Sequence, residues 1–430
     1  MLVARLHGTQ DIRISAEGPP AAGQNGDGSE VLVRVTAVGI CGSDLHWWTE
    51  GAIGDATLAG PLVLGHEGAG VIESGPRAGQ RVAIDPAIAC GTCRACRDGY
   101  RNLCYRIRFA GHGGTDGMMR EVMAWPSALL HPLPDSVSDA AGAMLEPLGV
   151  ALWSLDLGHL PFGGVASVAG CGPIGLLLIQ VLRAAGASRV IAVEPLAHRR
   201  EAAARCGADV VLTPDEPVSE LGVDVAFEVA GRDDGVRVAL ESVRPGGRVV
   251  LVGIPDGDTT TFTASLARRK GLTIAMTRRM NDVYPRAITL AARGVVDLEP
   301  LVSRRVALDE AAAGFTAAAG RAGLKVVVEP QRHLEPGVRL LPAAVREVLR
   351  RAGARRLRLE RGRLLGRQVG GCRGRVELGA RRGRLHGAAA QRPGEVAEGL
   401  APPAADVGVG DGAGAAEPAG GGHGLDELKP

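Results

Sequence analysis

The feature that most constrains the fold is an alternation of short apolar runs with helix-like segments, which begins near Gly164. The runs VASVAG, RVIAVE, DVVLT, VDVAFEVAG and GGRVVLVGI read as strands, and the segments PIGLLLIQVLRAAGA and EPLAHRREAAARCGA read as helices between them. Strands that alternate with helices form βαβ units, and such units build a parallel sheet with helices on its faces. The sequence therefore predicts an α/β domain over residues 151–285.

A glycine motif marks the first turn of this domain. Gly170-x-Gly172-x-x-Gly175 follows an apolar strand and precedes a helix, with Pro173 and Ile174 completing the turn. The glycines allow a tight turn, close approach of a pyrophosphate to the backbone, and close helix–strand packing, and the helix N-terminus then faces the phosphates. The motif alone is weak in so glycine-rich a chain. Its position between a strand and a helix predicts a dinucleotide-binding (Rossmann) domain.

The acid that ends the next strand indicates which dinucleotide would bind. Glu194 stands 24 residues after Gly170. An acid there accepts hydrogen bonds from the adenosine ribose and repels a 2′-phosphate, so NAD is favoured over NADP. The basic segment 198–200 leaves NADP open. Arg199 within it is a candidate cofactor contact, although a solvated helix residue is the simpler interpretation.

Residues 1–150 have a different pattern, in which the β-rich runs EVLVRVTAVG, GAGVIESG and QRVAIDPA are separated by glycines and prolines. This pattern predicts a mostly β domain with long loops. Residues 286–330 end in GLKVVVEP, which we expect to form a strand that returns to and completes this domain.

The β domain contains a dense cysteine segment, CGTCRACRDGYRNLC, named here the cysteine lobe (residues 90–104). Its spacing is Cys90-x2-Cys93-x2-Cys96-x7-Cys104. A bacterial ferredoxin cluster has a closer fourth cysteine followed by proline, and a redox pair needs only two thiols. Four thiolates suit tetrahedral zinc with no position left for substrate. Three arginines in the lobe can balance part of the negative charge, namely Arg94, Arg97 and Arg101. We therefore expect a closed structural zinc site.

A second set of potential ligands is spread along the chain. Cys41 lies in GICGSDLHWW, His66 and Glu67 lie in LGHEGAG, and Glu146 lies in MLEPLGVALW. Cysteine, histidine and carboxylate form the mixed ligand set of a catalytic zinc, which keeps one position for water or substrate. Each residue alone is weak evidence, because a solitary histidine is more often structural. Their appearance together with a structural zinc lobe and a nucleotide motif predicts a catalytic zinc centre.

These motifs together resemble the zinc-containing medium-chain dehydrogenase/reductase superfamily, in its polyol dehydrogenase branch, over residues 1–329. The stretch GICGSDLHWWTEGAIGDATLAGPLVLGHEGAGVI is most similar to the L-idonate 5-dehydrogenase group of that branch, and RFAG and EPLGVALW agree. The resemblance implies a GroES-like β domain that carries a catalytic and a structural zinc. It also implies a Rossmann domain that binds NAD(P), and assembly into dimers or tetramers.

The resemblance also implies roles for single residues. Cys41, His66 and the two acids surround the catalytic zinc, and it stays open whether Glu67 or Glu146 is the direct ligand. Ser43 stands where the family's hydroxyl accepts the substrate proton, and His46 continues the relay to solvent.

The same resemblance places the substrate pocket. Trp47 lines it where polyol enzymes commonly have tyrosine, and Arg278 in TRRMNDVYPRAI is a substrate contact. Arg279 departs from the family, because relatives usually have an aromatic residue there. A second arginine fits a carboxylate-bearing substrate. We therefore expect oxidation of L-idonate to 5-keto-D-gluconate, with sorbitol or xylitol as the alternative polyol substrate.

The whole-chain composition limits the partners. The 430 residues carry a formal net charge of +2, which gives no overall attraction to nucleic acid. The chain has no apolar run of about eighteen residues, and MLVARLHGTQDIRIS lacks the apolar segment of a secretory signal. We expect a cytoplasmic enzyme that binds a small molecule, without nucleic acid or membrane partners.

The last hundred residues, 331–430, form an Arg/Gly/Ala-rich tail with 17 Arg and 1 Lys against 11 Asp and Glu. Such a composition buries too little apolar surface to offset chain entropy, so we expect the tail to be disordered. A zinc-containing nucleic-acid binder that uses this basic tail is a remote alternative. It leaves the glycine motif and the mixed ligand set unexplained.

Overall fold

The computed structural model forms two compact units, Met1–Arg356 and Leu357–Pro430. In the second unit, two short antiparallel strands pair, β21 (Arg358–Glu360) and β22 (Arg363–Leu365). The structure describes residues 1–21, 30–331, 358–360 and 363–365. Apart from Gln331 and the two strands, the tail that was predicted to be disordered lies outside the described residues.

The β domain is built around a seven-stranded sheet in the order β12-β8-β7-β3-β20-β19, with β11 also paired to β3. A three-stranded sheet, β2-β1-β6, lies beside it, and both contribute to one hydrophobic core. The strands of this domain are β1 (Leu2–Gly8), β2 (Asp11–Ala16), β3 (Glu30–Gly39), β4 (Ala52–Ile53), β5 (Ala56–Thr57), β6 (Leu62–Val63), β7 (Glu67–Ile72), β8 (Arg81–Ile84), β9 (Ala87–Ile88), β10 (Arg108–Phe109), β11 (Val122–Pro126), β12 (Leu130–Pro132), β19 (Val302–Ala307) and β20 (Lys325–Glu329).

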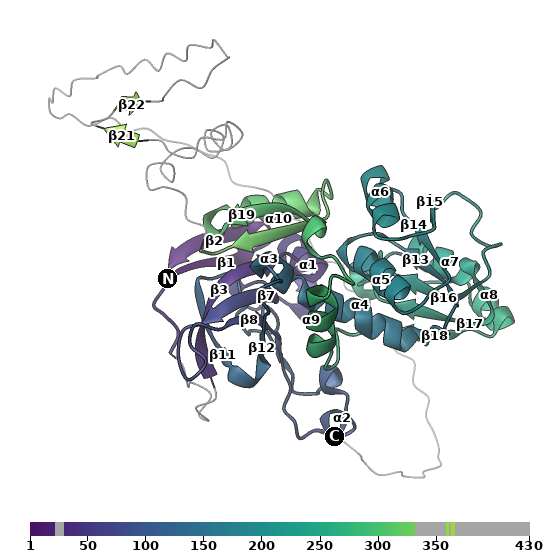
Figure 1. Cartoon of the computed structure of the whole chain (residues 1–430), viewed down its shortest axis with the longest axis horizontal. Coiled ribbons are helices and arrows are strands. Elements are labelled where there is room, and N and C mark those ends of the chain that lie inside the picture. The colour runs from purple at the N-terminus through teal and green to yellow at the C-terminus, as the bar shows by residue number, and fades with distance from the viewer. Residues whose placement is uncertain (22–29, 332–357, 361–362, 366–430) are drawn as a thin grey trace, which may run out of the picture. The chain divides into compact units, whose positions relative to one another are not determined.

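The two late strands, β19 and β20, join the main sheet of the β domain. Strand β20 pairs antiparallel with β3, where Val328 stands opposite Val38, and β19 pairs parallel with β20. Figure 1 shows these late strands and helix α10 (Ala311–Ala319) beside the N-terminal strands. The chain thus leaves the β domain, forms the α/β domain and returns.

The α/β domain contains a six-stranded sheet in the order β15-β14-β13-β16-β17-β18, and all of its pairs are parallel. Its strands are β13 (Val165–Ala169), β14 (Arg189–Val193), β15 (Val210–Leu212), β16 (Val223–Glu228), β17 (Val243–Leu251) and β18 (Thr273–Met276). The predicted series of strands ended too early, because β18 is a further edge strand. Its four residues, TIAM, are half-buried or exposed, as expected for a short strand at the edge of a sheet.

Helices cover both faces of this sheet. Strand β16 shows why, since Val225 and Phe227 pack with α4 and α5, whereas Ala226 faces the cluster that includes α7. The α-helices among the described residues of the first unit are α1 (Gly42–Glu50), α2 (Arg94–Arg97), α3 (Asp139–Ala143), α4 (Leu145–Gly158), α5 (Pro173–Ala184), α6 (Ala197–Arg205), α7 (Asp233–Ser242), α8 (Ala264–Lys270), α9 (Tyr284–Ala292) and α10. Strand order reverses between β13 and β16, which is where open α/β sheets bind ligands.

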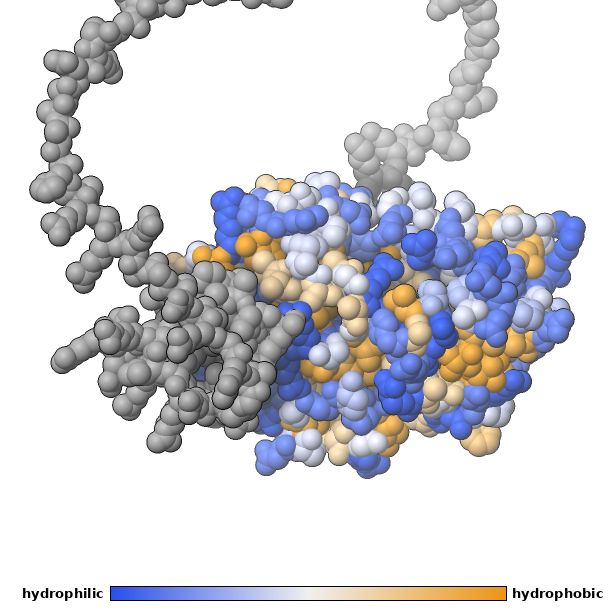
Figure 2. Space-filling model, turned by 90° about the horizontal axis from the view of Figure 1, so that it is seen from above, coloured by the Kyte–Doolittle hydropathy of each residue, from blue (hydrophilic) through white to orange (hydrophobic). Residues whose placement is uncertain are grey.

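Polar residues cover much of the face seen in Figure 2, with hydrophobic residues between them. Among the described residues, no helix combines the length and the apolar character needed to cross a membrane.

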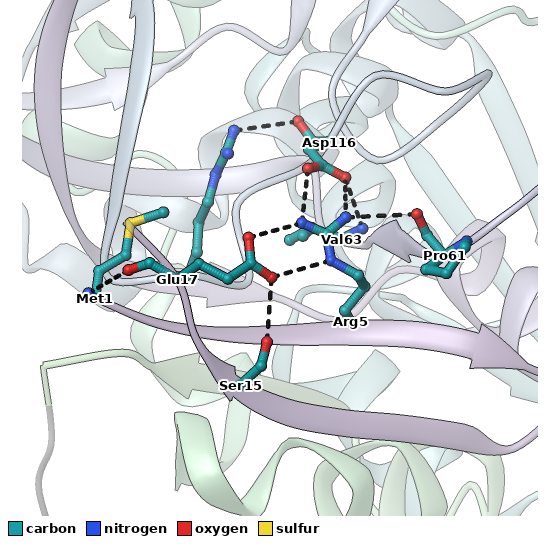
Figure 3. Close-up of polar contacts among 8 residues, drawn as sticks. Met1, Arg5, Ser15, Glu17, Pro61, Val63 and Asp116 are labelled. Carbon is teal, nitrogen blue, oxygen red and sulfur yellow. Dashed lines mark hydrogen bonds and ion pairs between the residues drawn. The ribbon is translucent and has the colours of Figure 1, made fainter. Parts of the chain in front are cut away.

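An ion-pair network ties the N-terminal strands to Asp116, which lies between β10 and β11 (Figure 3). Arg5 on β1 binds Glu17 at 3.0 Å and Asp116 at 2.9 Å. Asp116 Oδ1 also accepts a hydrogen bond from the backbone N–H of Val63 at 3.0 Å. The hydrogen bond from Arg5 lowers the pKa of Glu17. The network fixes the segment between β10 and β11 against β1 and β6.

Candidate active site

A cleft of about 570 Å³ lies where the β domain meets the α/β domain. From the β domain it is lined by Cys41, Trp47 and His66, and from the α/β domain by Ile174 and Val229. The candidate metal ligands and the nucleotide motif therefore face the same space.

Three of the predicted ligands, Cys41, His66 and Glu67, form a cluster, and Cys41 and His66 line this cleft. Their potential ligand atoms all lie within 4.8 Å of one another. Cys41 is the N-cap of α1, and His66 and Glu67 stand at the start of β7, so the fold brings together residues that are distant in sequence. Thiolate, imidazole and carboxylate are the ligand types that zinc accepts, so this donor set fits a zinc ion.

Asp44 orients the cluster, although the sequence motifs did not single it out. Its buried carboxylate accepts hydrogen bonds from the backbone N–H of Cys41 at 3.0 Å and of Gly65 at 3.1 Å. Its Oδ1 lies 3.5 Å from His66 Nδ1. A carboxylate at Nδ1 fixes the tautomer of a ligating histidine and leaves Nε2 free for the metal. Its position three residues after the N-cap of a helix is the signal that could have identified it.

The electrostatics of the cluster favour a cation. Burial lowers the pKa of His66, but the Asp44 carboxylate and the Cys41 thiol outweigh burial and raise it well above its usual value. Burial raises the pKa of Asp44, but His66 and the two backbone N–H donors lower it overall. Without a metal ion, the proton on the His66 imidazole supplies the positive charge beside Asp44 and Cys41. A zinc ion bound at Nε2 would supply that charge instead.

Lys325 is the second residue that the sequence reasoning missed. Its Nζ donates to Glu67 Oε1 at 2.7 Å and to the carbonyl oxygen of Ile40 at 3.0 Å. Both side chains are almost fully buried, at 3% and 1% exposed. Burial is the largest influence and lowers the pKa of Lys325, but Glu67, Cys41 and Glu146 together outweigh burial and raise it. The pair therefore holds the Glu67 side chain in place beside Cys41 and His66.

Glu146 faces the same cleft from the first turn of α4. Burial raises its pKa to about 7, His66 opposes this change and Glu67 adds to it. In the part of the chain that the structure describes, Glu146 lies outside the 4.8 Å set of Cys41, His66 and Glu67. Glu67 is thus the acid that lies closer to Cys41 and His66. Which of the two acids would bind the metal directly stays a prediction.

Ser43 and His46, the expected proton relay, both lie on α1 and line the cleft. Ser43 Oγ is 3.3 Å from His66 Nε2, whereas His46 Nδ1 lies 2.9 Å from Glu50 Oε1. Among the described side chains, no hydrogen bond joins Ser43 to His46. The relay beyond Ser43 therefore stays a prediction, and it would need a bridging group from a bound molecule.

The glycine motif forms the turn between β13 and α5, with Gly172 as the N-cap of α5. Gly170 has φ +101°, and a Cβ there would lie 2.8 Å from the backbone nitrogen of Ala230. A Cβ at Gly175 would lie 2.0 Å from the carbonyl oxygen of Gly170. At Gly172 a Cβ would meet only Arg199 Nη1, at 3.8 Å. The second glycine therefore leaves space in which a pyrophosphate fits.

Glu194 and Arg199 lie beside this turn. Glu194 accepts hydrogen bonds from the backbone N–H of Cys171 at 2.7 Å and of Leu196 at 3.0 Å, so its carboxylate is tied to the glycine turn. Arg199 lies half-buried on α6, so its interpretation as a solvated helix residue stays a prediction. Its Nε is buried, and it has no hydrogen-bond partner among the described residues. Cofactor contact by Arg199 stays a prediction.

The cysteine lobe brings its four thiols to one point, with all sulfur atoms within 4.8 Å of one another. Cys93 Sγ lies 3.5 Å from Cys96 Sγ and 3.9 Å from Cys104 Sγ. A tetrahedral zinc with bonds of about 2.3 Å places its sulfurs roughly 3.8 Å apart, so the arrangement fits a zinc tetrathiolate.

Charge in the lobe supports the same fit. Backbone N–H groups of Thr92 and Cys93 lower the pKa of Cys90 to about 5, whereas burial and the neighbouring thiols raise the pKa of Cys96 to about 12. The thiols thus oppose each other's ionisation, which a divalent cation relieves. Arg106 donates to Cys90 Sγ at 3.5 Å. Balancing the negative charge of the thiolates is the role that the sequence predicts for the three arginines inside the lobe. Arg106 lies two residues beyond the last cysteine, so the cysteine spacing did not point to it.

The predicted substrate residues Arg278 and Arg279 also line the cleft. The guanidinium carbon of Arg279 lies 3.9 Å from the ring centroid of Phe109, and its Nη1 is buried without a hydrogen-bond partner among the described residues. Phe109 in turn contacts the ring of His66, at 5.2 Å between centroids. Burial and repulsion from Arg278 lower the pKa of Arg279 to about 10, so it is charged at neutral pH.

Trp47 is buried and meets the edge of His112 at 5.4 Å between ring centroids. Burial, followed by repulsion from Arg279 and Arg278, lowers the pKa of His112 to about 4. His112 is therefore neutral at pH 7, and the arginines are the cations of this part of the cleft.

The fold and the site define a zinc- and nicotinamide-dependent dehydrogenase. Two family models match the chain, the alcohol dehydrogenase GroES-like domain at residues 26–135 and the zinc-binding dehydrogenase at residues 173–293. The chain is 33% identical to sorbitol dehydrogenase from Bacillus subtilis over 77% of this chain and 98% of the relative.

Solved structures agree with this assignment. L-idonate 5-dehydrogenase from Escherichia coli K-12 superposes with a TM-score of 0.71 at 27% identity, covering 76% of this chain and 97% of that one. A zinc-binding dehydrogenase from Sinorhizobium meliloti 1021, bound to NADP, gives a TM-score of 0.70 at 31% identity, covering 76% and 99%. The chain therefore belongs to the zinc-containing medium-chain dehydrogenase/reductase superfamily, in its polyol dehydrogenase branch.

Proposed function

We propose that this enzyme oxidises a secondary alcohol of a sugar acid with NAD, and that L-idonate is converted to 5-keto-D-gluconate. The observation that carries this proposal is the cationic end of the cleft. Arg279 presents a buried, unpartnered Nη1, and Arg278 stands beside it. A guanidinium with free donors pairs a carboxylate bidentately, whereas a neutral polyol offers it only hydroxyls. The similarity to the Escherichia coli idonate enzyme supports the same substrate class.

The reaction moves a hydride from the alcohol carbon to NAD and releases one proton, so that the alcohol becomes a ketone. A zinc ion at Cys41, His66 and one acid would supply Lewis-acid polarisation of the hydroxyl, and the nicotinamide would supply the hydride acceptor. Ser43, whose Oγ lies 3.3 Å from His66 Nε2, would accept the hydroxyl proton. Asp44 holds the His66 ring, and Glu146 offers a second buried carboxylate in the cleft.

NAD is the proposed cofactor because Glu194 stands at the end of β14 and is tied to the glycine turn. Arg199 near Gly172 is compatible with NADP as a second cofactor. The ratio of kcat/KM for NAD to that for NADP tests this point. A ratio below one would overturn the preference and leave the dehydrogenase proposal in place.

Sorbitol or xylitol is the second candidate substrate. The observation that favours a neutral polyol is the identity of 33% to the Bacillus subtilis sorbitol dehydrogenase along nearly its whole length. Under this alternative the zinc chemistry is unchanged, and Arg278 and Arg279 serve substrate hydroxyls.

The test is the initial rate of NAD reduction with L-idonate, sorbitol and xylitol at equal concentrations, repeated with Arg279→Gln. We expect L-idonate to lead. Hydrogen bonds to charged groups are worth about 1.5–3 kcal/mol, so the variant should lose roughly 10- to 100-fold in kcat/KM with L-idonate and little with sorbitol. A wild-type lead for sorbitol or xylitol, or an equal loss with all substrates, would contradict the sugar-acid proposal.

A further inference from the structure

Two asparagine side chains connect the cysteine lobe to the substrate loop, residues 277–283. Asn102 in the lobe donates from Nδ2 to the carbonyl oxygen of Arg278 at 2.9 Å. Asn281 in the loop donates from Nδ2 to the carbonyl oxygen of Gly99 in the lobe, also at 2.9 Å. In each bond, the asparagine side chain of one segment donates to a backbone carbonyl of the other segment. The lobe therefore supplies one donor, and the substrate loop supplies the other.

The substrate loop needs such support because its backbone is strained. Arg279 has φ +54° and Asp282 has φ +50°, and residues other than glycine rarely adopt such values. Strained residues persist where surrounding structure over-determines them. A third contact from the lobe reaches the same loop, since Arg101 Nε lies 3.9 Å from Asp282 Oδ1.

The opposite side of the loop is closely packed. Met280 and Val283 are buried against α4, where a Cβ on Gly149 would lie 2.3 Å from Met280 Sδ. Asn102 is itself only 4% exposed. The loop is therefore held between α4 on one side and the lobe on the other.

We propose that the cysteine lobe positions the substrate-binding arginines, with Asn102 and Asn281 as positioning residues. The two hydrogen bonds fix the backbone on either side of Arg279. They thereby hold its guanidinium against Phe109 and in the cleft. The inference rests on the proposed function, because it takes Arg278 and Arg279 as contacts of the substrate. It gives the lobe a part in substrate selection in addition to its structural zinc.

This arrangement predicts an effect on substrate binding and not on the chemical step. Neither asparagine is among the residues that line the cleft, so loss of either hydrogen bond leaves Cys41, His66 and Ser43 in place. A misplaced arginine weakens capture of the substrate. KM should therefore rise while kcat stays nearly constant.

The experiment compares Asn102→Ala and Asn281→Ala with the matched control Asp98→Asn, an exposed lobe residue that pairs with Arg94. Steady-state kinetics with L-idonate and sorbitol, zinc per chain and Tm are measured on the full-length enzyme. We expect both asparagine variants to raise KM for the acid about three- to tenfold. We also expect kcat to stay within about twofold, with zinc content unchanged and the control like wild type.

Other outcomes separate the two proposals. Wild-type preference for L-idonate, with an unchanged KM in both asparagine variants, would overturn the positioning role alone. Wild-type preference for sorbitol would overturn the sugar-acid proposal, and the positioning role would then appear as a raised KM for sorbitol in both variants. If Asn102→Ala loses zinc or fails to fold, Asn281→Ala decides, because Asn281 is only partly buried and lies outside the lobe.

Discussion

The two candidate zinc sites of this chain are built in opposite ways. The cysteine lobe takes four like ligands from one short segment, and its thiols are mostly half-exposed. The cluster of Cys41, His66 and Glu67 takes three unlike ligands from two distant segments, and two of them, Cys41 and His66, line a cleft. Its supporting groups, Asp44 and Lys325, are buried. The closed site suits a structural role, and the open site suits chemistry.

The largest expected effect separates the two sites by activity. Cys41→Ser keeps a residue suited to the N-cap of α1 but removes a thiolate ligand from the open site. Lewis-acid polarisation is worth several kcal/mol, so kcat/KM should fall about 10³-fold or more while Tm changes little. Initial rates and thermal unfolding measure this, with Cys206→Ser as the matched control, because Cys206 is a half-buried cysteine outside both clusters. Near-normal activity in Cys41→Ser would contradict the assignment.

The next effect tests the buried counter-charge of the open site. Lys325→Met leaves the buried Glu67 carboxylate without its ammonium partner. Breaking a buried pair in this way destabilises a protein by about 3–5 kcal/mol. Denaturant unfolding of the zinc-depleted protein should show this loss. Arg106→Met in the lobe is the matched control, because Arg106 is exposed and water screens its charge. Equal losses of unfolding free energy in Lys325→Met and Arg106→Met would show that burial of the charged partner does not distinguish the two sites.

Cys93→Ser tests the closed site. Removal of one of four thiolates should release the lobe's zinc and lower Tm by on the order of 10 °C, because a structural zinc contributes its binding energy to folding. The kcat of the remaining folded enzyme should stay within about threefold of wild type, with KM raised through the substrate loop. Zinc analysis, Tm and kinetics on the same preparation measure all three. A collapse of kcat with unchanged Tm would reverse the roles of the two sites.

The smallest effect concerns orientation of a ligand. Asp44→Asn keeps the shape of the side chain but weakens its hold on His66 Nδ1. Loss of such a partner typically costs about 10- to 100-fold in metal affinity or activity. Zinc competition with a chelator should show weaker retention by one site only. Unchanged affinity at that site would show that Asp44 serves only the backbone N–H groups of Cys41 and Gly65.

The same contrast explains what the sequence could predict. The cysteine lobe is visible in the sequence because its ligands and their spacing are local. The glycine turn and most strands of the α/β sheet are visible for the same reason. Lys325 and Arg106 were missed because their roles depend on contacts that form only in the folded chain. Asp44 has a sequence signal, its position three residues after the N-cap of α1, but its contact with His66 Nδ1 also forms only in the folded chain.

Strand β18 was missed because so short an apolar run does not by itself distinguish a strand from a loop or a helix segment. The bonds between the lobe and the substrate loop could not be predicted either, because Asn102 and Arg278 are 176 residues apart. Arg279 was noticed in the sequence, but its buried Nη1 and its place over Phe109 come from the fold alone.

The central claim is that the open site performs the chemistry and the closed site holds structure. The most direct measurement follows NAD reduction, zinc per chain and Tm together while a chelator removes zinc stepwise from the full-length enzyme. We expect activity to disappear with the loss of one zinc per chain while Tm stays near its starting value. Tm should fall only as the second zinc leaves. Full activity after removal of the zinc held by Cys41, His66 and their neighbouring acid would contradict it.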